Sequence, residues 1–178
     1  AEAAAAELEL TDVTINHWYA EEWSANDTIT AKMDEWYKAG TEVIFSCGGS
    51  ICKNAFAAAE ELGKATIGVD LDQAKDSSTV ITSAMKGCAN ATYDALMGYK
   101  NGNFPGGQDA VLGTAVDCVG LATGDSWKLV NYTEAQYQEL YTRMKNDEGG
   151  IASSIPTDMD IADPTEMTLE YVNLDYKN

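Results

Sequence analysis

The stretch EVIFSCGGSICKNAFAAAEELGKATIGVD, at residues 42–70, decides the fold of this chain. It begins with an apolar, strand-like run and passes through Gly48-Gly49-Ser50 into a helical pattern over residues 51–62. Gly63 stands where a helix C-cap belongs, and a second apolar run follows at residues 65–70. A strand, a helix and a second strand in this order predict a βαβ unit, in which the two strands are parallel.

The alternation of strand and helix patterns continues on both sides of this stretch. Strands are predicted at residues 12–18, 42–47, 65–70, 78–85 and 109–116, and helices at residues 28–39, 51–62, 88–100 and 134–145. Strands that alternate with helices of this length predict right-handed crossovers and a mainly parallel sheet that helices cover on both faces. The expected fold class is therefore α/β, with a three-layer, doubly wound sheet.

The ends of the chain differ from its middle. AEAAAAELEL has neither Met, nor a basic region, nor an apolar signal segment, and it has the pattern of the latter part of an Ala-rich helix ending near Leu8. We therefore expect the chain to start inside a larger protein, with any signal peptide or lipid-attachment cysteine upstream. We expect residues 1–150 to form one α/β ligand-binding lobe. Residues 151–178 hold two of the three prolines and no clear helical pattern, so an extended C-terminal tail is expected there.

Composition and charge exclude some classes of partner. A chain of 178 residues with 45% hydrophobic residues is large enough to bury the core of one domain or lobe. With 11 Lys and Arg against 29 Asp and Glu, its formal net charge of −18 repels phosphate backbones, so no nucleic-acid partner is expected. The longest apolar runs are far shorter than the roughly 20 residues that cross a bilayer. Contact with a membrane is expected only through an upstream lipid anchor.

The four cysteines do not form a recognisable metal motif. Cys47 and Cys52 are separated by four residues, which is wider than the usual spacing of a zinc pair, and Cys88, Cys118 and the single His17 do not complete a four-ligand set. No metal is expected. Two alternatives remain open for the cysteines: small buried thiols, or a disulfide if the protein is exported.

Chemistry-bearing residues follow the predicted strands at the edge where an open parallel sheet binds its ligands. The segments after the first four strands are WYAEEW at residues 18–23, CGGS at 47–50, DLDQ at 70–73 and Met85-Lys86. Aromatic rings, a corner without side chains, carboxylates and a lysine suit a small polar ligand with a flat face. A phosphate pocket fits poorly because CGGSICK lacks the P-loop spacing, and no dinucleotide-binding glycine motif is present, so no cofactor is expected.

Each of these features also has a purely structural interpretation. The two tryptophans, Trp18 and Trp23, could cover the edge of the core, and Gly48-Gly49 could be only a tight turn between a strand and a helix. Asp70 could cap a turn, and Lys86 could be a solvated lysine in the first turn of a helix. Their joint placement on one sheet edge favours a ligand-binding site.

A series of motifs in the correct order resembles a known family. The aromatics near residues 19–23 are followed by GTEVIFSCGGS, ATIGVDLDQ, VITSAMK, VGL and a late GGIASSIP. This order is similar to the C-terminal lobe of the BMP (basic membrane protein) or PnrA-like family, the substrate-binding lipoproteins of ABC transporters. The resemblance implies a lobe of the type I periplasmic-binding-protein fold, a nucleoside ligand, ABC permease partners, and an extracytoplasmic, membrane-anchored protein.

The resemblance also implies roles for particular residues. Trp23 occupies the place of the aromatic that stacks on the base, and Asp70 that of the aspartate that binds the ribose hydroxyls. Lys86 corresponds to the lysine that reaches the ligand, and Gly48, Gly49 and Ser50 to the corner that lines the pocket through its backbone. Trp18, Tyr19 and Asp72 are secondary candidates.

The chain also departs from the family pattern. Ala25-Asn26 replaces an Asp-Pro pair, the segment between Asp72 and Thr79 looks shortened, and the N-terminal lobe with its share of the contacts is absent.

Two other function classes remain as alternatives. A hydrolase would use Cys47 or Ser50 as nucleophile and His17 as base, but the G-x-S-x-G motif is absent and His17 falls inside a predicted strand, so no catalytic residue is expected. A ligand-sensing lobe of a receptor or regulator would use the same fold.

Overall fold

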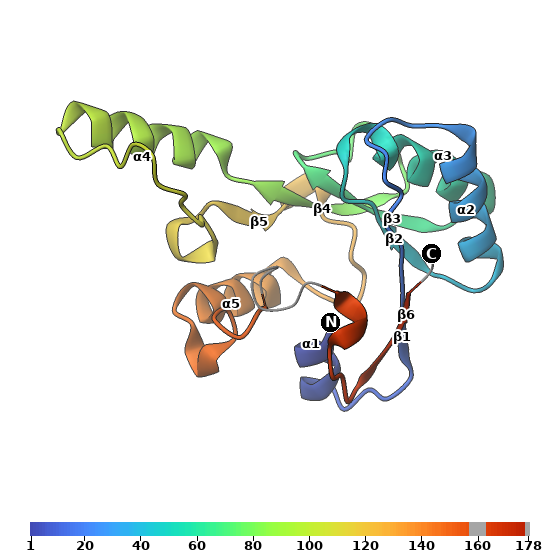
Figure 1. Cartoon of the computed structure of the whole chain (residues 1–178). Coiled ribbons are helices and arrows are strands. Elements are labelled where there is room, and N and C mark those ends of the chain that lie inside the picture. Colours follow the sequence, from blue (N-terminus) through green and yellow to red (C-terminus); the bar gives the residue numbers. More distant parts are fainter. Residues whose placement is uncertain (157–162, 177–178) are drawn as a thin grey trace. The chain divides into compact units, whose positions relative to one another are not determined.

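The computed structural model describes residues 1–156 and 163–176 of the chain (Figure 1). The backbone divides into two compact units. The sheet unit comprises Glu22–Asn146, and the terminal unit comprises Ala1–Glu21 with Asp147–Asn178. In the described part of the chain, no helix is both long enough and apolar enough to span a bilayer.

A four-stranded sheet forms the centre of the sheet unit (Figure 1). Its strands are β2 (Val43–Phe45), β3 (Ala65–Asp70), β4 (Val80–Lys86) and β5 (Val119–Leu121), and they lie side by side in this order. The first three strands are parallel, whereas β5 is antiparallel to β4. The predicted α/β class with a mainly parallel sheet is confirmed.

Two helices supply most of the core of this unit. Helices α2 (Asp27–Lys38) and α3 (Cys52–Leu62) pack against each other, and α3 also packs against β2 and β3. The buried apolar residues include Ile29, Met33 and Tyr37 of α2, Ala55, Phe56, Ala58 and Ala59 of α3, and Ile44 and Val80 of the sheet. Helix α3 ends at Gly63 in the left-handed conformation, as predicted, because glycine adopts positive φ without a Cβ clash.

The remaining helices of the sheet unit differ in how they are held. Helix α5 (Glu134–Lys145) begins at Thr133, as predicted, with a capping box in which Thr133 and Gln136 satisfy each other's backbone N–H groups. Tyr137 of α5 accepts a hydrogen bond from the backbone N–H of Leu121 at 2.8 Å, which ties the helix to β5. Helix α4 (Cys88–Lys100) has no buried residue, and Figure 1 shows it extending outward from the sheet.

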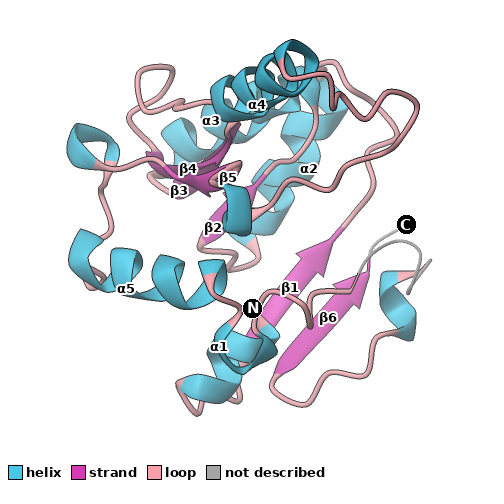
Figure 2. Cartoon of the chain, turned by 90° about the vertical axis from the view of Figure 1, so that its left-hand side faces the viewer, coloured by secondary structure: helices cyan, strands magenta, loops and turns pink. Residues whose placement is uncertain are grey.

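The terminal unit brings the two ends of the chain together. Strands β1 (Val13–His17) and β6 (Val172–Tyr176) form a two-stranded parallel sheet, clearly visible in Figure 2, and α1 (Glu2–Glu7) precedes β1. The carboxylate of Glu2 accepts hydrogen bonds from the backbone N–H groups of Glu170 at 2.8 Å and Tyr171 at 3.1 Å. The bond from Glu170 is the main cause that lowers the pKa of Glu2. Residues 157–162 and 177–178 of the expected tail lie outside the described residues.

One predicted strand has a different partner from the one expected, and another is absent. The strand at residues 12–18 was expected to be the first strand of the main sheet, but β1 pairs with β6 instead. Its alternating pattern identifies a strand, whereas the choice of partner depends on tertiary contacts. The predicted strand at 109–116 is absent: Thr114–Val116 form a 3-10 turn, and the strand comes later, as β5. Val111 is 97% exposed, so the burial of its side chain does not stabilise a strand there.

Candidate ligand-binding site

The carboxyl ends of the three parallel strands gather the main candidates at one edge of the sheet unit. The corner Gly48-Gly49-Ser50 follows β2, Asp70 is the last residue of β3, and Lys86 is the last residue of β4. This is the edge at which open α/β sheets bind their ligands. The structure thus brings together the residues that the strand pattern placed there.

Asp70 and Lys86 form an ion pair across neighbouring strands. Asp70 lies opposite Met85 in the β3–β4 register, so Lys86 is one residue further along, and its Nζ lies 2.7 Å from Asp70 Oδ1. The side chains are 47% and 66% exposed, respectively. A pair this exposed contributes little to folding stability. It places a carboxylate and an ammonium group side by side at the carboxyl edge of the sheet.

The backbone at Asp70 has an uncommon conformation. Asp70 has φ of +68°, and the N–H of Leu71 donates to the carbonyl of Val69 at 2.8 Å, which closes a three-residue γ-turn around it. The γ-turn with positive φ is the rarer and more strained form, and only short polar side chains and glycine tolerate that region readily. Strained backbone of this kind is enriched at functional sites, and Glu9, Glu21, Asp117 and Asp147 also have positive φ in this structure.

The ion pair predicts a titration that can be measured directly. The hydrogen bond and the charge of Asp70 raise the pKa of Lys86 above the ordinary value of 10.5. The pair's small contribution to stability is therefore fully present below that value and is lost as the pH rises through the raised pKa. We expect Asp70→Asn to lower the pKa of Lys86, measured from its side-chain carbon signals by NMR between pH 9 and 12. An equal pKa of Lys86 in Asp70→Asn and in wild type would contradict the pairing. The signals of the other lysines provide the internal control.

Trp23 is fixed to the glycine corner by its backbone. The N–H of Ser50 donates to the carbonyl of Trp23 at 2.8 Å, and the Ser50 hydroxyl accepts the N–H of Ala25 at 3.0 Å. The indole itself is 74% exposed. A large ring that is exposed while its backbone is tightly held provides a flat platform at low cost in conformational entropy.

Trp23 lies close enough to the corner to require glycine at position 49. Gly49 has φ of +47°, and a Cβ at this position would overlap with the carbonyl oxygen of Trp23. A Cβ on Gly48 would lie 3.7 Å from Cε3 of the indole. Gly49 therefore admits the main chain of Trp23, which supports the structural interpretation of the Gly48-Gly49 turn beside the ligand-binding one.

The segment after Trp23 is anchored to both helices. Asn26 caps α2 by accepting the N–H of Ile29 at 3.0 Å, and Asn54 of α3 donates to the carbonyl of Asn26 at 2.8 Å and to the hydroxyl of Thr30 at 2.7 Å. The departure from the family pattern at Ala25-Asn26 is thus accommodated, because Ala25 supplies an N–H to Ser50 and Asn26 supplies the cap.

Asp72 is engaged within the protein. Its Oδ2 accepts the hydroxyl of Ser126 at 2.6 Å and its Oδ1 accepts the N–H of Ala74 at 3.1 Å. The hydrogen bond from Ser126, followed by that from Ala74, lowers the pKa of Asp72. Both oxygens of Asp72 thus have partners within the protein, and Asp72 ties the loop after β3 to residues 124–126; a ligand role for it stays a prediction.

Trp18 and Tyr19 belong to the terminal unit. Trp18 is half-buried, whereas Tyr19 is exposed and meets the ring of His17 edge-on, with centroids 4.7 Å apart. The His17 ring also stacks on Tyr176 of β6 at 5.5 Å. The aromatic contacts of His17 and Tyr19 are therefore explained by packing between β1 and β6, and a ligand role for Trp18 and Tyr19 stays a prediction.

The thiols and hydroxyls offer little for catalysis. All four cysteines are free, with Cys52 and Cys118 buried and Cys47 and Cys88 exposed. Both hydrogen bonds of the Ser50 hydroxyl go to main-chain atoms, at Ala25 and Trp23. Among residues 1–156 and 163–176, no cluster of three or more His, Cys, Asp or Glu is arranged to hold a metal ion.

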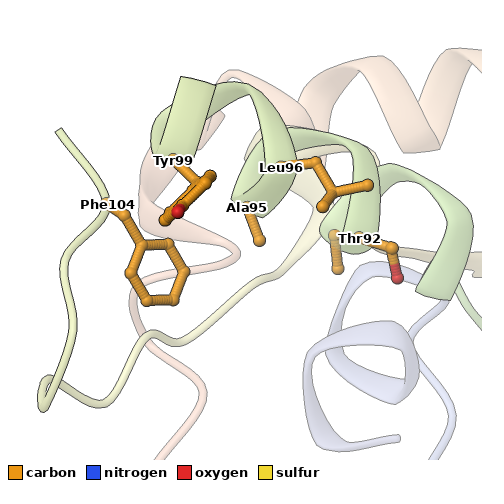
Figure 3. Close-up of a pocket in the computed structure, with 6 residues that line it drawn as sticks. Thr92, Ala95, Leu96, Tyr99 and Phe104 are labelled. Atoms are coloured by element: carbon orange, nitrogen blue, oxygen red, sulfur yellow. The ribbon is translucent and has the colours of Figure 1, made fainter. Parts of the chain in front are cut away.

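An apolar hollow lies on a different part of the sheet unit. It is on α4 and the loop that follows, has a volume of about 500 Å³, and is lined by Ala91, Thr92, Ala95, Leu96, Tyr99 and Phe104 (Figure 3). Its lining contains no charged group, and its only side-chain polar groups are the hydroxyls of Thr92 and Tyr99. It lacks the carboxylate and ammonium groups that the edge of the sheet provides for a polar ligand.

Comparison with known proteins gives a family match and several relatives. The sequence model for ABC transporter substrate-binding proteins of the PnrA-like type (Bmp) matches residues 8–153. The CD4+ T-cell-stimulating antigens of Listeria monocytogenes and Listeria innocua are each 31% identical over 121 residues, which is 58% of this chain and 34% of those proteins. The chain thus matches about a third of the length of these relatives.

A solved structure supports the fold. The crystal structure of a transcriptional activator of the comK gene from Bacillus halodurans superposes with a TM-score of 0.59 at 18% identity, covering 75% of this chain and 46% of that one. At this identity the likeness concerns the fold alone, and it agrees with the α/β sheet and helices described above.

Proposed function

The chain belongs to the PnrA-like (Bmp) family of ABC transporter substrate-binding proteins, and on this premise we propose that it is one lobe of an importer's binding protein that closes on a purine nucleoside. A partner lobe supplies the opposite wall of the site. We call the longer protein that contains both lobes the two-lobed protein.

The observation that carries this proposal is the arrangement at the carboxyl edge of β2, β3 and β4. A tethered, exposed indole lies against a corner without side chains, and a carboxylate–ammonium pair ends the next two strands. A purine offers a flat face for Trp23, and base–aromatic stacking tolerates different bases. A ribose offers vicinal hydroxyls, which are hydrogen-bond donors suited to a carboxylate.

Asp70 has acceptor capacity left for the sugar. Lys86 lies against Oδ1 at 2.7 Å, and nearly half of the Asp70 side chain is exposed. A carboxylate offers about four lone-pair positions, so the pair can accept ligand hydroxyls without giving up Lys86. Lys86 fixes the direction of the carboxylate and presents its remaining N–H donors to the ligand.

Charge favours a neutral nucleoside over a nucleotide. The protein carries a formal net charge of −18, and Asp70 neutralises the lysine at the edge of the sheet. A phosphate group there would meet a carboxylate and an acidic surface, and both would repel it. The expected substrate class is therefore an uncharged purine nucleoside.

In transport, this lobe acts by binding and carries out no chemical reaction. Ligand bridging two lobes stabilises the closed form, and the closed form is what the permease recognises. The protein acts outside the cytoplasm and is held at the membrane by a lipid on another part of the molecule. A sensing lobe of a receptor would close on its ligand in the same way, but a different partner protein would recognise the closed form.

The first test is a titration of this chain with adenosine, guanosine, inosine, cytidine and uridine, followed by amide chemical shifts. Because one wall of the site is absent, we expect weak binding. If the two-lobed protein binds with a Kd of about 1 μM and this chain supplies half of the binding free energy, this chain alone binds with a Kd of about 1 mM. Shifts should be concentrated at Trp23, Gly48-Gly49, Asp70 and Lys86.

Three outcomes would count against the proposal. Shifts concentrated on α4, or none at millimolar nucleoside, would show that the site is misplaced, and so would micromolar binding by this chain alone. Chromatography of the same samples tests the hydrolase alternative, since release of free base would reveal turnover. In the two-lobed protein, a nucleoside at 100 times its Kd should add about 2.7 kcal/mol to the free energy of unfolding.

A further inference from the structure

The uncommon backbone of Asp70 needs support from its surroundings. A non-glycine residue at φ of +68° costs free energy relative to the right-handed region, so the turn persists only if neighbouring contacts hold it. The ion pair with Lys86 is largely exposed and is too weak to do this alone. The contacts that hold the turn must lie beneath it.

The side chain of Gln73 supplies one of these contacts. Strand β2 pairs with β3 only as far as Ile67, and beyond that point the N–H of Val69 donates to Oε1 of Gln73 at 2.8 Å. The carbonyl of Val69 accepts the N–H of Leu71 in the γ-turn. Both backbone groups of the residue before Asp70 are therefore fixed, one by Gln73 and the other by the turn itself.

Gln73 is in turn held by buried groups on two other elements. Its backbone N–H donates to the hydroxyl of Ser83 on β4 at 3.0 Å, and its Nε2 lies 3.4 Å from Sγ of Cys52 on α3. Ser83 is fully buried and Cys52 is 4% exposed. Gly68 makes this possible, because a Cβ there would overlap with the Ser83 hydroxyl and lie 3.0 Å from both Cβ and Oε1 of Gln73.

We propose that Gln73 is a positioning residue of the ligand site, which holds Asp70 in its left-handed turn so that the carboxylate faces Lys86 and the ligand sugar. The ligand part of this inference rests on the proposed function. Gln73 links β3, β4 and α3 beneath Asp70, and the main-chain direction at Asp70 follows from that link. If Val69 loses its side-chain partner, Asp70 relaxes to negative φ and its carboxylate turns away from Lys86.

The test compares Gln73→Met with a matched control. Met has a similar length and shape but accepts and donates no such hydrogen bond. The control is Gln136→Met, because Oε1 of Gln136 also accepts a backbone N–H, that of Thr133 at 2.9 Å, in the same unit but in the cap of α5. Three readouts apply to both: the NMR couplings that report φ of Asp70, the titration of Lys86, and the affinity of the two-lobed protein for a ribonucleoside.

We expect Gln73→Met to shift the couplings of Asp70 to values for negative φ, to lower the pKa of Lys86, and to weaken ribonucleoside binding about tenfold, on the scale of one lost hydrogen bond. Gln136→Met should leave all three unchanged. Gln73→Glu keeps an acceptor for Val69 and should retain the positive φ. If Gln73→Met does not fold, Ser83→Ala removes the acceptor of the Gln73 N–H and is read in the same way.

The outcomes separate this inference from the proposed function. Unchanged couplings and an unchanged Lys86 titration in the variant that folds would overturn the positioning role, whatever the protein binds. Altered couplings in a protein whose wild type binds no ribonucleoside would support the turn-holding role of Gln73 and overturn the nucleoside assignment. A change of similar size in Gln136→Met would mean that a general loss of stability causes the effect, which also overturns the inference.

Discussion

Asp70→Ala is expected to weaken ribonucleoside binding by the two-lobed protein at least about a hundredfold, which is roughly 2.7 kcal/mol. The carboxylate ends β3 and lies 2.7 Å from Nζ of Lys86, so its removal takes away the acceptor proposed for the sugar hydroxyls and frees the lysine. Charge-assisted hydrogen bonds contribute about 1.5–3 kcal/mol each in favourable settings. Isothermal titration calorimetry measures the loss directly.

The left-handed turn provides a control for this substitution. Alanine at φ of +68° adds a backbone penalty of about 1–2 kcal/mol, so Asp70→Ala alters the turn as well as the carboxylate. Glycine adopts this φ without strain. Asp70→Gly should therefore lose as much affinity as Asp70→Ala while its unliganded form stays closer to wild type in stability. Affinity retained in Asp70→Gly but lost in Asp70→Ala would assign the effect to the turn and not to the carboxylate.

Chemical changes in the ligand test the same contact from the other side. The 2′,3′-dideoxy analogue should bind wild type more weakly than the ribonucleoside, yet the two ligands should differ little in Asp70→Gly. The coupling energy of the double-mutant cycle is the loss of binding free energy caused by the dideoxy change in wild type minus the same loss in Asp70→Gly. Additive losses would show that Asp70 does not hold the sugar.

The sequence predicted most elements of the sheet unit because their signals are local. Strand β3 and helices α4 and α5 have the predicted bounds, and Thr133 and Gly63 cap helices as expected. Capping depends on the residue type at one position and on its immediate neighbours. The edge location of Asp70 and Lys86 followed equally directly, since parallel strands bring their carboxyl ends together.

Features that depend on partners distant in the chain were missed or misassigned. The pairing of β1 with β6 joins the two ends of the chain, and no local pattern selects that partner. The hydrogen bonds of Ser50 with Trp23 and Ala25 were missed, while its place in the pocket lining stays a prediction. The sequence pattern did not single out Gln73, because its contacts with Ser83 and Cys52 form only when the chain folds.

Trp23→Ala is expected to cost the two-lobed protein about 1–3 kcal/mol of binding free energy, the scale of base–aromatic stacking. The indole is 74% exposed, so its loss should affect the free energy of unfolding much less than ligand binding. Trp23→Phe keeps a flat ring and should lose much less affinity. Calorimetry for binding and thermal unfolding for stability separate the two effects.

Two further variants test whether the Trp23 ring stacks on the base from its position beside the glycine corner. Trp18 is half-buried in the terminal unit, so Trp18→Ala should lower stability more than affinity, the reverse of Trp23→Ala. Gly49→Ala leaves the indole in the sequence but drives a Cβ into the carbonyl oxygen of Trp23 at a residue with φ of +47°. The platform must then move, so affinity should fall even though no ligand-facing side chain has been removed. Full affinity in Gly49→Ala, or a Trp18→Ala variant that loses binding while Trp23→Ala does not, would place the base against another surface.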